Sequence, residues 1–154
     1  MGVLVYRYME KILTLENIEE TAIYIIEEVR RRNSEKASVI AFSGDLGAGK
    51  TTLTKEIAKQ LGIKESVVSP TFVIMKIYKT KEKDFKNLIH IDAYRLDKSE
   101  ELLHLGWEEI SKNKENFIIV EWPERVPECL LSGVYKINIE HKSDTTRKIK
   151  FSNN

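Results

Sequence analysis

The chain is poor in cysteine, has no long apolar run and carries no excess charge of one sign. Cys129 is the single cysteine in 154 residues, so an intramolecular disulfide is excluded and a reduced, cytoplasmic protein is expected. No apolar stretch approaches the roughly 18 residues of a membrane span. Lys and Arg total 25 against 24 Asp and Glu, so no basic field favours direct binding to DNA or RNA. Contact with nucleic acid would be local or through a partner.

Length and composition favour one folded domain. The length lies within the usual range of roughly 100 to 200 residues, and 42% hydrophobic residues with only 7 glycines and 3 prolines exclude a disordered chain. We expect residues 10–154 to form this domain and residues 1–9 to be an N-terminal extension. Arg7 interrupts the extension, which is too short for a secretory signal. We expect residues 1–8 to be dispensable, with translation from Met9 as an alternative.

Strand and helix patterns alternate along the chain. Alternating polarity predicts a strand at 11–15, and an amphipathic helix follows, with Asn17 and Glu20 in capping-box spacing and its end near Arg32. Lysines interleaved with acids at 79–86 predict a solvated hairpin loop. The order predicts an α/β fold with a mostly parallel central sheet, flanking helices and some antiparallel edge strands. The other predicted strands are 38–43, 72–78, 87–92, 117–120, 134–140 and 147–151, and the other predicted helices are 51–61, 99–105 and 107–112.

The strongest motif is Gly-Asp-Leu-Gly-Ala-Gly-Lys-Thr at residues 44–51, which satisfies G-x-x-x-x-G-K-[ST]. It follows an apolar strand and opens a helix, the context that a phosphate-binding loop (P-loop) requires. The glycines let backbone N–H groups surround phosphates, Lys50 neutralises the β and γ phosphates, and Thr51 ligates Mg²⁺. The predicted ATP-binding residues are Gly44, Asp45, Leu46, Gly47, Ala48, Gly49, Lys50, Thr51 and Thr52.

Two carboxylates follow apolar strands at the edge where open α/β sheets bind ligands. Asp92 comes after Leu-Ile-His-Ile, and Glu121 comes after Phe-Ile-Ile-Val. Either could hold Mg²⁺ while the other positions or deprotonates the attacking water; each alone could also be a solvated acid at a strand end. The catalytic candidates are therefore Lys50, Asp92 and Glu121, and the metal candidates are Thr51, Asp92 and Glu121.

Two segments beside these acids have open roles. Ser69, Pro70 and Thr71 form a stiff turn where nucleotide-sensing switch segments commonly lie, and a simple loop before a strand explains them equally well. Trp122 directly follows Glu121. Its ring could pack against a nucleotide or fill the edge of the sheet.

Basic side chains near the acids give no clear arginine finger. Arg95 could meet a phosphate or pair with Glu100 or Glu101, and Arg125 is a second candidate. His90 alternates with isoleucines, which is more typical of a strand or core residue than of a catalyst. Slow ATP hydrolysis that a partner accelerates is therefore the natural expectation.

Taken together, five motifs resemble one family. They are G-D-L-G-A-G-K-T at 44–51, S-P-T-F at 69–72, H-I-D-A-Y-R-L at 90–96, E-L-x-x-L-G at 101–106 and E-W-P-E at 121–124. Their order and spacing are similar to those of the bacterial TsaE (YjeE) ATPases of tRNA threonylcarbamoyladenosine biosynthesis, from about Glu10 to the C-terminus.

The resemblance implies an Mg²⁺-dependent ATPase that works with the TsaD and TsaB proteins. That complex places a threonylcarbamoyl group on the adenosine beside the anticodon of tRNAs reading ANN codons, so tRNA would be met only through the complex. The resemblance also implies that Asp92 and Glu121 are essential acids, with Glu121 the metal ligand and Trp122 near the nucleotide. Weaker candidates, for the adenine side, are Asn17, Ile18 and Thr21.

Two other functions fit a P-loop of this length. A small-molecule or nucleotide kinase would need a lid with several arginines and a second substrate pocket, whereas the segment after the P-loop offers mainly lysines. A nucleotide-dependent assembly switch that does not hydrolyse ATP is the other alternative.

Overall fold

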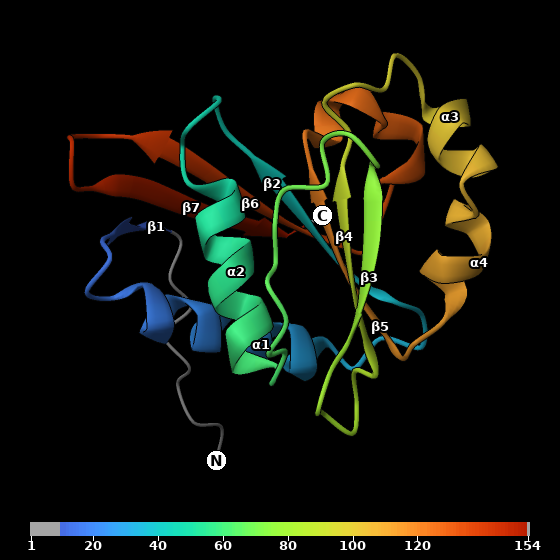
Figure 1. Cartoon of the computed structure of the whole chain (residues 1–154), viewed down its shortest axis with the longest axis horizontal. Coiled ribbons are helices and arrows are strands. Elements are labelled where there is room, and N and C mark those ends of the chain that lie inside the picture. The colour runs from blue at the N-terminus through green and yellow to red at the C-terminus, as the bar shows by residue number, and fades with distance from the viewer. Residues whose placement is uncertain (1–9, 154) are drawn as a thin grey trace.

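The computed structural model describes residues 10–153, and the expectations for residues 1–8 and Met9 lie outside this range. Within it, seven strands form one sheet in the order β1-β7-β6-β2-β5-β4-β3 (Figure 1). The strands are β1 (Glu10–Leu13), β2 (Ser38–Ser43), β3 (Met75–Lys79), β4 (Asn87–Asp92), β5 (Asn116–Glu121), β6 (Val134–His141) and β7 (Arg147–Asn153).

The strand directions confirm the predicted fold class. Strands β6, β2, β5 and β4 are parallel neighbours, and β3 pairs with β4, β7 with β6, and β1 with β7 in antiparallel fashion. The middle residues of β2 (39–42) and β5 (117–120) are apolar and buried, as expected for strands covered on both faces.

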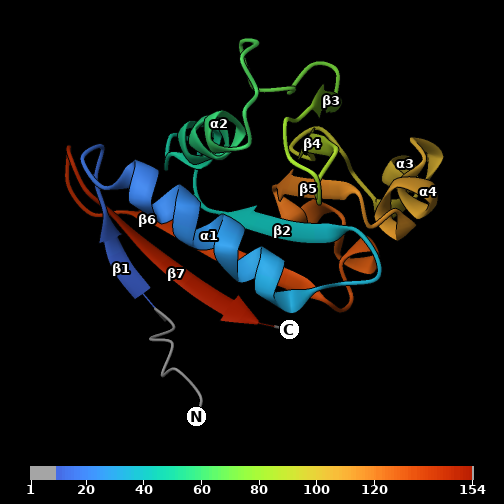
Figure 2. The same cartoon turned by 90° about the horizontal axis from the view of Figure 1, so that it is seen from below.

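Helices cover both faces of the sheet. On β2, Ile40 and Phe42 pack with α1 and α2, while Val39 and Ala41 pack with α3 and α4, because successive side chains point to opposite faces. Figure 2 shows α1 and α2 together, away from α3 and α4. The helices are α1 (Ile18–Arg32), α2 (Lys50–Gln60), α3 (Ser99–His104) and α4 (Trp107–Lys112), followed after β5 by the short 3₁₀ turns η1 (Pro123–Arg125) and η2 (Pro127–Cys129).

The strand predicted at 72–78 begins later, at Met75. The preceding residues form a turn in which the N–H groups of Val73 and Ile74 donate to the carbonyl of Pro70. Phe72 is 82% exposed, and Ile74 has a φ of 68°, a strained value for a β-branched residue. The apolar pattern of this segment therefore marks a surface loop, not a buried strand.

Two local predictions are also wrong in part. Asn17 makes no side-chain cap on α1; its Nδ2 donates to the carbonyl of Ile12, and its Oδ1 accepts from the N–H of Thr14, which fastens the helix to β1. The loop between β3 and β4 is a hairpin loop as predicted, but it is not fully solvated. Phe85 is buried in the core, and Arg30 of α1 pairs with acids of the loop.

No helix within residues 10–153 is long and apolar enough to cross a membrane.

Candidate functional site

The register of three parallel strands assembles the site at one edge of the sheet. Phe42 on β2 lies opposite Glu121 on β5, and Glu121 lies opposite Asp92 on β4. Strand β2 leads directly into the P-loop, which ends at the first turn of α2. The loop and both acids therefore share the carboxyl edge of the sheet, where such folds bind ligands.

Gly44 allows the P-loop to leave β2 at this edge. Its φ is 147°, and a Cβ atom at this position would lie 2.4 Å from the carbonyl oxygen of Ile139 on β6. No side chain fits at that distance, so only glycine permits the close approach of the two backbones.

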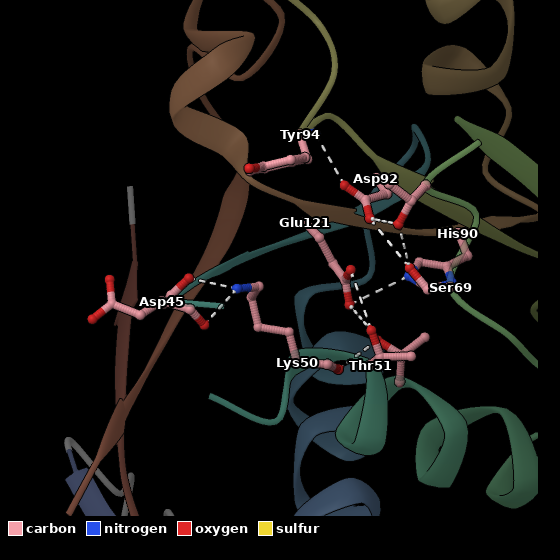
Figure 3. A network of polar contacts seen from close by, with 11 residues as sticks. Asp45, Lys50, Thr51, Ser69, His90, Asp92, Tyr94 and Glu121 are labelled. Carbon is pink, nitrogen blue, oxygen red and sulfur yellow. Dashed lines mark hydrogen bonds and ion pairs between the residues drawn. The ribbon is translucent and has the colours of Figure 1, made fainter. Parts of the chain in front are cut away.

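Lys50 points back over the P-loop. Its Nζ donates to the carbonyls of Gly44 and Asp45 (Figure 3). The same atom lies 4.2 Å from the centroid of the Trp122 ring. The side chain is only 6% exposed. Burial lowers the pKa of Lys50, and the nearby carboxylates, Glu121 foremost, oppose that shift. The ammonium thus rests on neutral oxygens and a ring face, and a bound anion would interact with it strongly.

Glu121 contacts the first turn of α2. The Thr51 hydroxyl donates to its Oε1 at 3.2 Å, and the carboxylate is 2% exposed. His90 Nε2 lies 3.4 Å from the same oxygen, and Figure 3 shows the two side chains next to each other. Both ring nitrogens of this fully buried histidine lack a hydrogen bond among the described residues. His90 is the buried strand residue that the sequence predicts, but its position beside Glu121 was not foreseen.

Asp92 holds the predicted switch segment. Its Oδ2 accepts hydrogen bonds from the hydroxyls of Ser69, at 3.3 Å, and Thr71, at 2.9 Å, while Oδ1 accepts from the N–H of Tyr94 (Figure 3). The backbone N–H of Asp92 also donates to the carbonyl of Ile74. Asp92 thus binds both ends of the turn to β4, one through its buried carboxylate and the other through its backbone N–H. Glu121 faces the P-loop helix instead.

A cavity of about 280 Å³ lies between these groups. Gly44 and Asp45 are not part of its lining, but their carbonyls accept hydrogen bonds from Lys50, which does line it. Its lining contains no arginine. The lining residues are Leu46, Gly47, Ala48, Gly49, Lys50, Thr51, Thr52, Ser69, Thr71, Asp92, Tyr94, Glu121 and Trp122.

A second cavity, of about 510 Å³, adjoins the first and shares Ala48, Gly49 and Thr52 with it. The turn between β1 and α1 forms one wall, and the turn between β6 and β7 forms the other. Ile18 lines this cavity, but Asn17 and Thr21 do not; the buried Thr21 hydroxyl donates to the carbonyl of Asn17. The other lining residues are Leu13, Thr14, Leu15, Glu16, Asp144, Thr145, Thr146 and Arg147.

Several contacts around the site could not be predicted from the sequence, because only the fold brings these residues together. Tyr94 packs against Trp122, with ring centroids 5.1 Å apart. The Arg95 guanidinium lies 4.4 Å from the centroid of Phe72, and no ion pair with Glu100 or Glu101 is found among residues 10–153. Arg147 reaches the P-loop from the far end of the chain. No motif in the sequence indicates these contacts.

The donor chemistry fits a hard divalent cation such as Mg²⁺. Thr51, Asp92 and Glu121 supply a hydroxyl and two carboxylates, and Mg²⁺ prefers oxygen ligands. Within the described part of the chain, no group of three or more His, Cys, Asp or Glu residues could hold a metal by itself. The arrangement suits an ion that is shared between one or two protein oxygens and phosphate oxygens.

Comparison with known proteins gives a consistent result. The family model for the threonylcarbamoyl adenosine biosynthesis protein TsaE matches residues 14–149. The Bacillus subtilis tRNA threonylcarbamoyladenosine biosynthesis protein TsaE is 37% identical over 88% of this chain and 81% of its own length. The Rickettsia prowazekii TsaE is 36% identical over 71% and 73%, respectively. The crystal structure of Bacillus subtilis YdiB matches with a TM-score of 0.62 and 29% identity, covering 94% of this chain and 87% of that one.

Proposed function

This chain belongs to the TsaE family of tRNA threonylcarbamoyladenosine biosynthesis proteins, and we propose that it serves that pathway as an Mg²⁺-dependent ATPase. The observation that carries the proposal is the contact of Thr51 with the buried Glu121 at the cavity that the P-loop lines. In this proposal the ATPase acts on the TsaD and TsaB proteins, tRNA is met only through their complex, and DNA is not a ligand.

Phosphate binding would use the P-loop backbone and Lys50. The N-terminus of α2 carries free N–H groups and partial positive charge, which favour an anion in the adjoining cavity. Lys50 would turn from the carbonyls of Gly44 and Asp45 to the β and γ phosphates. Because its charge is desolvated in the buried site, the exchange of neutral partners for an anion is favourable.

Thr51 and Glu121 would hold Mg²⁺, directly or through water. Their mutual contact supports the pairing, because a hydroxyl and a carboxylate that already meet can share one ion. When bound, the ion supplies positive charge that offsets the charge of the phosphates. His90 beside Glu121 limits where that carboxylate can lie.

Asp92 would orient the attacking water. It lines the same cavity as Thr51 and Glu121, but its oxygens accept from Ser69 and Thr71 instead of contacting α2. Water attacks the γ-phosphorus, the bond to the β–γ bridging oxygen breaks, and ADP leaves. Because Asp92 also holds the turn 69–74, we propose that this turn is the switch segment whose position depends on the nucleotide.

Exposed apolar side chains beside the cavity suit a protein partner. Leu46 and Phe72 are each 82% exposed, and Val73 is 65% exposed. They come from the two loops that border the cavity, the P-loop and the switch segment. Apolar residues gathered in this way commonly mark an interaction site. TsaD and TsaB docking here would sense the nucleotide through the same loops.

The structure does not support the alternative that the chain is a small-molecule or nucleotide kinase with a lysine-rich lid. The lysine-rich loop joins the ends of β3 and β4 at Lys79 and Asn87, opposite the end that carries Asp92. It therefore does not form a lid over the phosphate cavity.

The test of the proposal is ATP hydrolysis with and without the partners. We expect slow release of phosphate by the purified chain, dependent on Mg²⁺, and a rise of at least about tenfold when TsaD and TsaB are added, because the cavity lining holds no arginine. Lys50→Met is expected to weaken ATP binding by about 10- to 100-fold. Rapid hydrolysis by the chain alone, or phosphate transfer to a nucleoside acceptor, would contradict the proposal.

Replacing Phe72 by alanine is expected to weaken binding to the TsaD and TsaB pair by about 30-fold, since a buried aromatic at an interface centre contributes at least about 2 kcal/mol. Binding of ATP by the free chain is expected to stay within threefold. Titration calorimetry against the purified pair, with nucleotide present, measures both effects.

Leu131→Ala is the matched control for this experiment. Leu131 is 77% exposed, but it lies just before β6 begins, at the opposite end of the sheet from the P-loop. Equal losses in the two variants would show that the partner does not select the face around Phe72.

A further inference from the structure

Arg147 joins the end of the chain to the P-loop. Its Nε donates to the carbonyl of Ala48 at 3.0 Å. Its Nη1 donates to the carbonyls of Ser143, at 2.9 Å, and Thr146, at 3.0 Å. One guanidinium therefore fastens the turn between β6 and β7 to a loop that lies 99 positions earlier in the sequence.

This contact lies where the two cavities of the site meet. Ala48 belongs to the lining of both cavities, whereas Arg147 lines the larger one, next to Thr145 and Thr146. Figure 2 shows the β6–β7 turn, the β1–α1 turn and the start of α2 gathered at one end of the molecule. Apart from the hydrogen bonds of this guanidinium, none joins the β6–β7 turn (142–146) to the P-loop among residues 10–153.

We propose that Arg147 is a positioning residue that holds the wall of the larger cavity against the P-loop, so that the nucleoside half of a bound nucleotide has a fixed surface to pack on. The inference rests on the proposed binding of ATP. A nucleotide whose phosphates lie in the smaller cavity must pass Ala48, Gly49 and Thr52 to enter the larger one. A wall that is held in place before binding loses little freedom when the ligand arrives.

The chemistry of arginine suits this task. Its planar group presents several donors in a fixed fork, so it can hold carbonyls from two separate segments at once. The three acceptors are backbone oxygens and carry no formal charge. A lysine ammonium is more compact and lacks the fork.

The experiment compares ATP with inorganic triphosphate, which lacks the nucleoside half. Dissociation constants are measured for the parent, Arg147→Ala, Arg147→Lys and Lys148→Ala by competition against a fluorescent ATP analogue at fixed salt. Lys148 is the matched control because it is the next residue of β7 and carries the same charge, but its Nζ pairs with Glu10. Thermal unfolding of each variant checks that it is folded, and Arg147→Lys carries the comparison if Arg147→Ala does not fold.

We expect Arg147→Ala and Arg147→Lys to weaken ATP binding by at least about tenfold and triphosphate binding by less than threefold, while Lys148→Ala changes neither by more than twofold. Equal losses for the two ligands, or ATP binding within twofold of the parent, would overturn the role of Arg147. A parent chain that binds neither ligand would instead overturn the proposed function, and this inference with it.

Discussion

Replacing Glu121 by glutamine is expected to slow ATP hydrolysis by about 100- to 1,000-fold, the effect of removing one preorganised electrostatic group from a buried active site. Glutamine has nearly the same shape and keeps an oxygen that can accept from Thr51, so the contact at 3.2 Å can survive. What is lost is the negative charge that would hold Mg²⁺. The measurement is phosphate release at saturating ATP over a range of Mg²⁺ concentrations.

The control for this change is Glu124→Gln, which removes a carboxylate three residues away. Glu124 is exposed on η1 but, like Glu121, contributes to the field at Lys50. We expect its rate to stay within threefold, since an exposed charge is screened by water and salt. A Glu121→Gln protein that retained a third of the parent rate would remove Glu121 from the proposed chemistry and leave Asp92 as the essential acid.

The fold class could be predicted from local patterns because those patterns report burial directly. The runs at residues 39–42 and 117–120 are apolar throughout, as the centre of a parallel sheet requires. The same logic failed at Phe72, where an apolar residue lies in an exposed turn. An apolar pattern indicates that a segment has an apolar face. It does not show whether another part of this chain or a partner protein covers that face.

Some features of the candidate site could likewise be predicted from the sequence, and others could not. The P-loop could be found because consecutive residues make it, and Asp92 and Glu121 because each ends an apolar run. The contacts of Arg147 with Ala48, of His90 with Glu121 and of Arg95 with Phe72 depend on strand order and loop conformation. One sequence carries no signal for such pairs, so the structure was needed to find them.

Replacing Gly44 by alanine is expected to lower the free energy of unfolding by about 3 kcal/mol or more, because a steric clash adds to backbone strain, and to abolish measurable ATP binding. The new Cβ would lie 2.4 Å from the carbonyl oxygen of Ile139, a backbone atom of β6. Strand β6 is held by ladders to β2 and β7 on its two sides, so it cannot move aside easily. The loop must shift instead, and with it the Gly44 carbonyl that holds Lys50. Equilibrium unfolding in urea measures the stability, and fluorescent ATP measures the binding.

Gly47→Ala separates the clash from the backbone strain. Gly47 has a φ of 79°, which also disfavours alanine, but a Cβ atom there would meet nothing within 4 Å. The left-handed conformation alone costs about 1–2 kcal/mol, so we expect Gly47→Ala to be the milder variant by at least about 1 kcal/mol, or roughly 2–4 °C in melting temperature for a chain of this size. Equal destabilisation in the two variants would mean that β6 yields to the new methyl group. The close packing of β6 against the end of β2 would then not be what requires glycine at the start of the P-loop.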